Sequence, residues 1–265
     1  MDRVRALVID MDGVLWRGSA PLPGLRPLFA VLRSRRLPFV LATNNASQPP
    51  EVFVERLAAF GVRVGRDEVL TSAQATALEL ARRSPGGGRV FAIGDEGVRR
   101  ALEEAGFTLI GPGEVDADYV VCGMDRGLTW DKLAAATLNI RAGATFVGTN
   151  PDLTFPTERG LVHGNGAVLA ALQAATGVAP EIVGKPEPGM YRMAAAILGA
   201  DPAGTVAVGD RLDTDVLGAV RAGMRSVLVL SGVTTPADLA ASTVRPTWVM
   251  QDVAELARAL EQAAA

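Results

Sequence analysis

The stretch Ala6-Leu7-Val8-Ile9-Asp10-Met11-Asp12-Gly13 decides the fold of this chain. Four consecutive apolar residues lead into two acids at positions i and i+2, and the glycine that follows lets the chain turn away. Because the apolar residues are continuous rather than alternating, they predict a parallel strand that is buried on both faces. Two carboxylates beyond such a strand suit a nucleophile with a neighbouring acid or base, or two oxygen ligands of a hard cation. Taken alone, Asp10 and Asp12 are as typical of a helix cap and a turn as of a catalytic or metal-binding pair.

The same pattern continues along the chain of 265 residues. Eight further apolar runs predict strands at 39–42, 90–93, 119–122, 145–147, 181–183, 206–208, 226–230 and 247–250. Amphipathic stretches between them predict helices at 51–60, 73–83, 98–105, 131–141, 167–176, 189–198, 215–222 and 253–263. Continuous apolar strands separated by helices predict an α/β fold whose core is a doubly wound parallel sheet. Turn-forming stretches at 84–88 and 177–180 enclose three strand–helix units, which favours a smaller α/β domain inserted into that core.

The composition excludes several kinds of catalytic site. The chain has a single His and a single Cys. One His cannot supply the several ligands of a zinc hydrolase, and Cys122 lacks the Cys-x5-Arg spacing of cysteine phosphatases. A Ser-His-Asp triad is disfavoured because no G-x-S-x-G motif occurs. We therefore assign no catalytic role to His163, and we expect Cys122 to be a small buried residue.

The charge and hydropathy patterns limit the partners of the protein. The chain carries 26 Lys and Arg against 29 Asp and Glu, a net charge of −3, which argues against a nucleic acid polymer as the main partner. No apolar run reaches the roughly 18–20 residues of a membrane span. The N-terminal residues also lack the regions of a signal peptide. We expect a cytoplasmic protein that binds no membrane.

Polar residues cluster at further strand ends, where α/β sheets place their active sites. The second strand runs into Thr43-Asn44-Asn45, whose hydroxyl, amides and backbone N–H groups suit an anion, although helix capping alone would favour the same residues. Lys132 and Lys185 are the only lysines of the chain, and Lys185 lies between a predicted strand and a helix. A compact ammonium at that position suits a nucleophile or phosphate oxygens better than the planar fork of an arginine.

The last cluster follows the strand predicted at 206–208. Asp210 ends that strand, and Asp215 lies five residues later in the first turn of the next helix. Asp95 also ends a predicted strand, but the residue five positions beyond it is Arg100. We therefore interpret Asp95 as a cap or turn residue.

Four motifs thus occur in a set order: D-x-D at 10–12, a Thr at 43, a Lys at 185 and G-D-x(4)-D at 209–215. This combination resembles the haloacid dehalogenase superfamily of phosphotransferases, and the D-x-D form implies a phosphatase. The stretch 10–16, Thr43-Asn44-Asn45 and the long insertion before the Lys motif resemble the class II branch. That branch includes p-nitrophenyl, nucleotide, sugar, phosphoglycolate and pyridoxal phosphatases. The resemblance implies a Rossmann-like catalytic core at 1–77 and 179–265 and an α/β cap domain at 78–178.

The resemblance also implies roles for the motif residues. Asp10 is expected to attack phosphorus and form an aspartyl-phosphate, and Asp12 to act as general acid and then base. Mg²⁺ is expected on the Asp10 carboxylate, the Asp12 carbonyl and Asp210, with Lys185 as a second positive charge. Asp215 is expected to orient Lys185 or a metal-bound water.

Two more groups of residues receive roles from the resemblance. Thr43, Asn44 and Asn45 are expected to hold the phosphoryl oxygens. In the cap, Asn150, Asp152 and Phe155 are the expected specificity residues, in a loop at 150–156. The substrate is a small phosphomonoester whose identity stays open, as does the choice between a monomer and a homodimer.

A phosphoryl-accepting switch and a non-enzymatic ligand-binding protein of the same fold are the alternatives. In a phosphoryl-accepting switch the acidic pair binds the metal, and a later Asp accepts the phosphoryl group. Such a protein is also only about half as long as this chain. The D-x-D motif before the Thr and the long insertion argue against it. A binding protein would be expected to have lost an acid or the Lys, and all are present.

Overall fold

The computed structural model describes residues 1, 4–157 and 160–263. The chain divides into two compact units. Unit 1 comprises Met1–Thr43, Glu51–Leu70 and Lys185–Ala265, and unit 2 comprises Asn44–Pro50 and Thr71–Gly184. The domain boundaries expected from the sequence lie at 77/78 and 178/179, and these boundaries stay a prediction.

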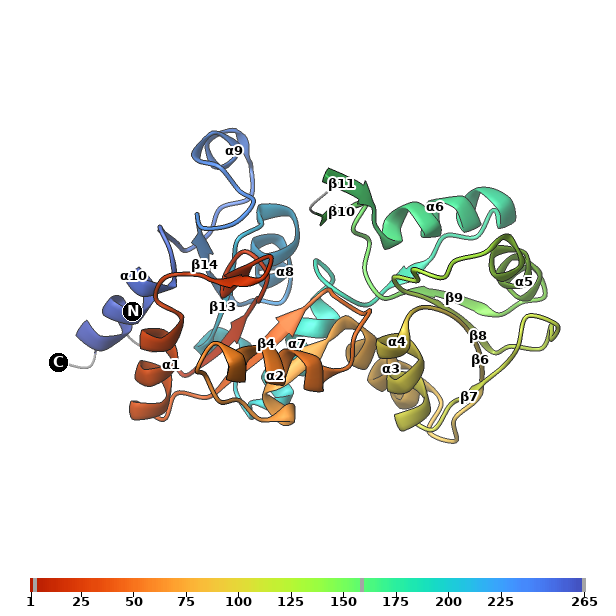
Figure 1. Ribbon diagram of the computed structural model, residues 1–265, viewed down its shortest axis with the longest axis horizontal. Helices are drawn as coiled ribbons and strands as arrows, with labels where there is room; N and C mark the ends of the chain where they lie inside the picture. The colour runs from red at the N-terminus through yellow and green to blue at the C-terminus, as the bar shows by residue number, and fades with distance from the viewer. Residues whose placement is uncertain (2–3, 158–159, 264–265) are drawn as a thin grey trace. The chain divides into compact units, whose positions relative to one another are not determined.

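Unit 1 is built on a six-stranded sheet (Figure 1). In spatial order its strands are β15 (Trp248–Met250), β14 (Arg225–Val229), β13 (Thr205–Gly209), β1 (Ala6–Ile9), β4 (Phe39–Thr43) and β5 (Val69–Thr71). The pairs from β15 to β4 are all parallel. In β1 every residue is buried, and Leu7 and Ile9 belong to the main apolar core. The neighbouring side chains point to the opposite face, so both faces are covered, which explains the continuous apolar run.

Helices cover this sheet. They are α1 (Leu25–Ser34), α2 (Pro50–Ala59), α7 (Pro188–Ile197), α8 (Leu217–Arg221), α9 (Pro236–Ala241) and α10 (Val253–Gln262). Helices α1 and α10 pack together, and their apolar faces share one core with Leu7 and Ile9. Helix α7 packs against β1, β4 and α8. A two-stranded hairpin of β2 (Trp16–Arg17) and β3 (Ala20–Pro21) follows the D-x-D motif.

Unit 2 has its own parallel sheet of five strands. In spatial order these are β12 (Glu181–Ile182), β9 (Thr145–Gly148), β8 (Tyr119–Cys122), β6 (Arg89–Ile93) and β7 (Thr108–Leu109). Its helices are α3 (Ser72–Arg83), α4 (Glu96–Glu104), α5 (Trp130–Arg141) and α6 (Asn165–Thr176). With two parallel sheets and helices between their strands, the expected α/β fold class is confirmed.

The structure differs from the sequence-based elements in several places. The expected loop at 150–156 contains the start of β10 (Thr154–Thr157), which pairs antiparallel with β11 (Gly160–His163). The expected helix 215–222 begins instead with a π-helical turn at Leu212–Val216, and α8 starts only at Leu217. Helix α1 is not among the helices predicted from the sequence, and its Pro27 lies in the first turn. The helix forms because a proline in the first turn loses no hydrogen bond that the helix would make.

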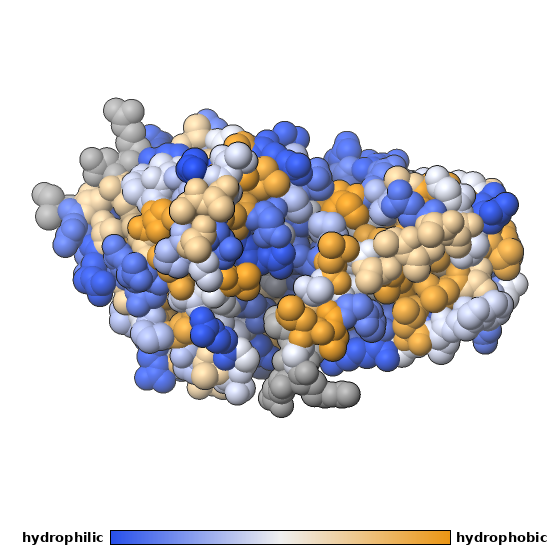
Figure 2. All heavy atoms as spheres, turned by 90° about the horizontal axis from the view of Figure 1, so that it is seen from above, coloured by the Kyte–Doolittle hydropathy of each residue, from blue (hydrophilic) through white to orange (hydrophobic). Residues whose placement is uncertain are grey.

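An apolar groove of about 480 Å³ lies between α5 and α6 of unit 2. Its lining includes Trp130, which is 79% exposed, together with Leu133, Leu138 and Leu172. Exposed apolar residues appear orange among hydrophilic ones in Figure 2. Within the described part of the chain, no helix has both the length and the apolar character that crossing a membrane requires.

The single thiol provides a test of the packing of unit 2. Cys122 ends β8 in the apolar core and is completely buried, and burial raises its pKa. We expect the native protein to react with Ellman's reagent at pH 8 only as fast as unit 2 opens, and to react at once in guanidinium chloride. Immediate reaction of one thiol per native chain would contradict this placement, and the Cys122→Ala variant provides the blank.

Candidate active site

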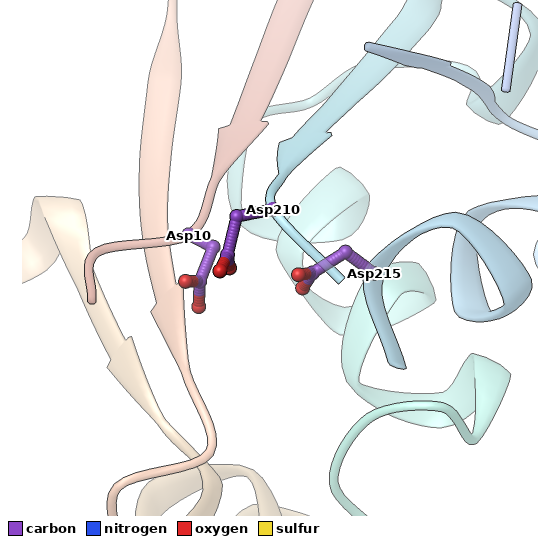
Figure 3. Close-up of side chains that lie close together, drawn as sticks. All are labelled: Asp10, Asp210 and Asp215. Carbon is purple, nitrogen blue, oxygen red and sulfur yellow. The ribbon is translucent and has the colours of Figure 1, made fainter. Parts of the chain in front are cut away.

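Three acidic side chains meet at the carboxyl ends of β1 and β13. The two strands are neighbours in register, with Ile9 opposite Val208, so Asp10 and Asp210 follow at adjacent positions. Asp215 reaches the same place from the π-helical turn after β13. Oxygen atoms of the three carboxylates lie within 4.8 Å of one another. Figure 3 shows the three side chains gathered at the ends of their strands and the following turn. All three belong to unit 1.

Lys185 places its ammonium among these carboxylates. Its Nζ donates hydrogen bonds to Asp10 Oδ1, to Asp215 Oδ1 at 2.7 Å and to the carbonyl of Ala42 at 3.1 Å. The residue is only 3% exposed. A buried ammonium is tolerated only when acceptors surround it, and here the acceptors come from three separate segments of the chain.

The site carries an excess of negative charge. Three carboxylates surround one ammonium, which leaves about two negative charges when all four groups are ionised. Burial raises the pKa of Asp10 well above its ordinary value, and Asp215 and Asp210 add to the shift against the opposing effect of Lys185. Burial, with repulsion from Asp215, raises the pKa of Asp210 to about 7. For Lys185, burial lowers the pKa, but the carboxylates of Asp10 and Asp215 outweigh it and the net shift is upward.

These residues fit a divalent cation. Asp10 Oδ2 and Asp210 Oδ1 accept no hydrogen bond from the described residues, whereas both oxygens of Asp215 are engaged, by Lys185 and by the Arg211 backbone N–H. Carboxylate oxygens are hard ligands of the kind that Mg²⁺ prefers. Two surplus negative charges also match the charge of such an ion. The chemistry therefore favours Asp10 and Asp210, rather than Asp215, as the carboxylate ligands.

Gly13 keeps the space beside Asp210 open. Its φ is +81°, a conformation that other residues rarely adopt. A Cβ at this position would lie 2.5 Å from Asp210 Oδ2. Ser231 Oγ donates to the Gly13 carbonyl at 2.8 Å, which holds the turn after the D-x-D motif in place.

Asp12 is held by a tryptophan. Trp16 Nε1 donates to Asp12 Oδ1 at 2.7 Å, and Trp16 is completely buried. Although Asp12 is an exposed residue, enough protein surrounds its carboxyl for desolvation to be the largest influence on its pKa, which is raised. The hydrogen bond from Trp16 and the positive charges of Arg56 and Lys185 oppose that rise only in part.

The predicted phosphate-binding residues follow β4. Thr43 is the last residue of that strand and is buried, and it belongs to unit 1. Asn44 and Asn45 are half-buried and belong to unit 2. Asn45 Oδ1 accepts hydrogen bonds from the N–H and the hydroxyl of Ser47, at 3.0 and 2.7 Å, which is the local turn that capping chemistry predicts.

The three cap residues lie in unit 2 and differ in exposure. Asn150 is buried, Asp152 is half-buried, and Phe155 on β10 is 37% exposed. Asp152 Oδ2 accepts a hydrogen bond of 3.0 Å from Asn44 Nδ2, so the cap segment contacts the segment after β4. The carboxylate of Asp95, which we interpret as a cap or turn residue, accepts hydrogen bonds from the backbone N–H and the guanidinium of Arg126.

Several groups at the site were not identified from the sequence. The Ala42 carbonyl accepts from Lys185, Tyr191 Oη donates to the Asp215 carbonyl at 3.1 Å, and the Val233 N–H donates to Asp210 Oδ2 at 2.7 Å. Two of these three are backbone groups, which carry no signal in residue type. In the sequence, Trp16 is only the last residue of the stretch 10–16 that carries the resemblance, although a donor four residues after an acid is a usable signal.

Comparison with known proteins agrees with this geometry. The family model described as Haloacid dehalogenase-like hydrolase matches residues 7–108, and the HAD-hydrolase-like model matches residues 182–256. An acid sugar phosphatase of Staphylococcus aureus (strain USA300) is 39% identical over 262 residues, which cover 99% of this chain and 100% of the relative.

Solved structures give the same result over nearly the whole chain. A 4-nitrophenylphosphatase from Thermotoga maritima superposes with a TM-score of 0.92 at 34% identity, covering 98% of both chains. NagD from E. coli K-12 superposes with a TM-score of 0.88 at 35% identity, covering 95% of this chain and 98% of that one.

The chain therefore belongs to the haloacid dehalogenase superfamily. Its full-length similarity to 4-nitrophenylphosphatase, NagD and acid sugar phosphatase identifies the class IIA branch, and the protein is a phosphatase. The expected fold class, a Rossmann-like parallel core with a smaller α/β cap domain, is confirmed by the same superpositions.

The two lysines form a matched pair for testing the site. Lys185→Arg should lower kcat/KM for p-nitrophenyl phosphate by about a hundredfold or more, because a planar guanidinium cannot replace a buried ammonium held by three acceptors. Lys132→Arg should leave it within about twofold, because Lys132 is partly exposed and pairs only with Asp125 among the described residues. Equal losses in the two variants would contradict the special role of Lys185.

Proposed function

We propose that the protein is a Mg²⁺-dependent phosphomonoesterase that transfers the phosphoryl group of small metabolites to Asp10 and then to water. The observation that carries the proposal is the buried cluster of Asp10, Asp210, Asp215 and Lys185 at the carboxyl ends of two neighbouring strands. It combines a nucleophile, cation ligands and an ammonium in one place. The phosphatases to which the chain is similar along its whole length support the same reaction.

Asp10 is the proposed nucleophile. Lys185 orients the carboxylate through Oδ1. One carboxylate oxygen attacks phosphorus while the ester oxygen departs, and the other would contact the cation. Asp215 keeps Lys185 in this position through the 2.7 Å hydrogen bond to its ammonium. The ammonium also offsets the repulsion between a carboxylate and a phosphate dianion.

Asp12 is the proposed acid and base. Trp16 occupies its Oδ1, so Oδ2 carries the proton that passes to the leaving alkoxide. Burial raises the pKa of Asp12, which favours the protonated form that a general acid needs. The same carboxylate then takes a proton from the water that hydrolyses the aspartyl-phosphate.

The cation would be held by the Asp10 and Asp210 carboxylates and the Asp12 carbonyl, and when bound it would supply positive charge to the phosphoryl oxygens. The support for these ligands is the oxygen of Asp10 and of Asp210 that accepts no hydrogen bond from the described residues. The Thr43 hydroxyl and the backbone N–H groups of Asn44 and Asn45 would bind the remaining phosphoryl oxygens.

Sugar phosphates are the proposed substrate class, because the acid sugar phosphatase is 39% identical over 99% of the chain. Of the three predicted cap residues, Phe155 is the one with substantial exposure, and it would influence which ester is accepted. A homodimer is proposed on the exposed apolar groove of unit 2, and a cytoplasmic location stays a prediction.

The two acids of the D-x-D motif should respond differently to loss of charge. Asp10→Asn should abolish turnover of every ester, because an amide does not attack phosphorus. Asp12→Asn should lower kcat/KM for a sugar phosphate by about 10²–10⁴-fold and for p-nitrophenyl phosphate much less, because nitrophenolate leaves without a proton. Steady-state assays of both substrates measure this.

The same assays address the alternatives. Turnover that survives in Asp10→Asn would reject the nucleophile. A phosphoryl-enzyme in the wild type that forms but never hydrolyses would favour the phosphoryl-accepting switch. Equal losses of Asp12→Asn on both esters would reject its role as general acid.

The cation ligands can be tested without an activity assay. Addition of Mg²⁺ to EDTA-treated protein should raise Tm, because the ion binds the folded state and relieves carboxylate repulsion. In Asp210→Asn the shift should be much smaller, since one carboxylate ligand and one surplus charge are removed. Asp213→Asn is the matched control, because Asp213 is exposed and pairs with Arg211. Equal Tm shifts in wild type and Asp210→Asn would contradict the assignment.

A further inference from the structure

The carbonyl of Asn44 is held by two buried donors of unit 2. Ser72 Oγ donates to it at 2.7 Å and Asn150 Nδ2 donates to it at 2.9 Å. Ser72 is completely buried at the start of α3, and Asn150 is 5% exposed after β9. A carbonyl that accepts from two side chains on different elements has its direction set by both.

The two donors are themselves fixed. Ser72 is the first residue of a helix whose N-cap, Thr71, exchanges two hydrogen bonds with Gln74. Asn150 Oδ1 accepts from the Asp152 N–H at 3.2 Å, so both ends of the Asn150 amide are engaged. Rotation of the Asn150 amide away from the Asn44 carbonyl would therefore break a second hydrogen bond, and the capped helix start holds the backbone of Ser72 in place.

The side chain of Asn44 is restrained as well. Its Nδ2 donates to Asp152 Oδ2 at 3.0 Å. Gly184, the residue before Lys185, packs on the same group, since a Cβ on Gly184 would lie 2.3 Å from the Thr149 carbonyl and 2.8 Å from Asn44 Oδ1. No larger residue fits between the segment after β4 and the segment after β9.

These contacts determine the direction of one backbone N–H. The peptide bond between Asn44 and Asn45 is trans, so its carbonyl and its N–H point in opposite directions. The donors that fix the Asn44 carbonyl therefore also aim the Asn45 N–H away from Ser72 and Asn150. In the proposed function that N–H is one of the groups that bind the phosphoryl oxygens.

We infer that Ser72, Asn150 and Asp152 are positioning residues for the phosphoryl group, which act by holding the Asn44–Asn45 peptide. The inference rests on the proposed function and deepens it. It gives Asn150 and Asp152 an indirect influence on the substrate, and it adds Ser72, which the sequence motifs did not include. Because the phosphoryl group is common to all substrates, these residues affect every ester alike.

The test compares two esters and one inhibitor. In Ser72→Ala and in Asn150→Ala, kcat/KM for p-nitrophenyl phosphate and for glucose 6-phosphate should fall by the same factor, roughly three- to tenfold for one lost hydrogen bond. The inhibition constant of inorganic phosphate, measured on the same proteins with Mg²⁺, should rise by a similar factor. Asp152→Ala should behave likewise, and Asp152→Asn, which keeps an acceptor oxygen for Asn44 Nδ2, should recover most of the loss.

Asn139→Ala is the matched control. Asn139 is a buried asparagine of unit 2 whose amide also bonds backbone groups, namely the Glu114 and Ala135 carbonyls and the Ala117 N–H. Loss of the Asn139 amide and its hydrogen bonds should lower Tm and leave the inhibition constant of phosphate unchanged. If Asn150→Ala does not fold, Ser72→Ala decides, because it removes the other donor to the same carbonyl.

Three outcomes would overturn the inference. The first is an unchanged phosphate inhibition constant in Ser72→Ala and Asp152→Ala. The second is a change in the ratio of the kcat/KM values for the two esters, which would mean that these residues contact the leaving group directly. The third is an equal rise in Asn139→Ala, which would mean general loosening of unit 2. A wild-type protein that neither hydrolyses the esters nor binds phosphate would reject the proposed function itself, and this inference with it.

Discussion

The ammonium of Lys185, buried between Asp10 and Asp215, is the interaction on which the active site depends. Removing one partner of a buried charge pair costs about 3–5 kcal/mol, because the other charge is left without compensation. The pair can form only if β1, the end of β4 and the π-helical turn after β13 all reach the same point. Correct folding of unit 1 and assembly of this charged cluster are therefore the same event.

The charged cluster also lowers the folding stability of unit 1. Three carboxylates share one ammonium, so burial and mutual repulsion raise the pKa of Asp10 and of Asp210. A purely structural cluster would have balanced these charges, as the exposed ion pairs of the chain do. The surplus negative charge, and the two carboxylate oxygens that accept no hydrogen bond from the described residues, explain why a small divalent cation and a phosphoryl group suit this position.

The longer buried strands were predictable, and most short or exposed strands were missed. All nine apolar runs form strands, and seven of these strands are buried along almost their whole length, because such a run hides its side chains between two layers of helices. The strands β12 and β15 are partly exposed, and the short buried strand β5 was missed. The hairpin of β10 and β11 went unnoticed, because its described side chains are largely exposed and show no alternation. The short strands β2, β3 and β7 carry too few residues for any periodicity.

The sequence by itself determined the fold class, the order of the four motifs and the identity of Asp10, Asp12, Thr43, Lys185, Asp210 and Asp215 as candidates. Residue type, strand-end position and spacing are local properties, so they can be recognised from the order of the residues alone. Only the tertiary structure decided which atoms these residues contact. Lys185 reaches Asp10 across 175 positions, and Asn150 reaches the Asn44 carbonyl across 106. Such contacts depend on which strands become neighbours and on backbone groups that every residue shares, and a sequence read in order records neither.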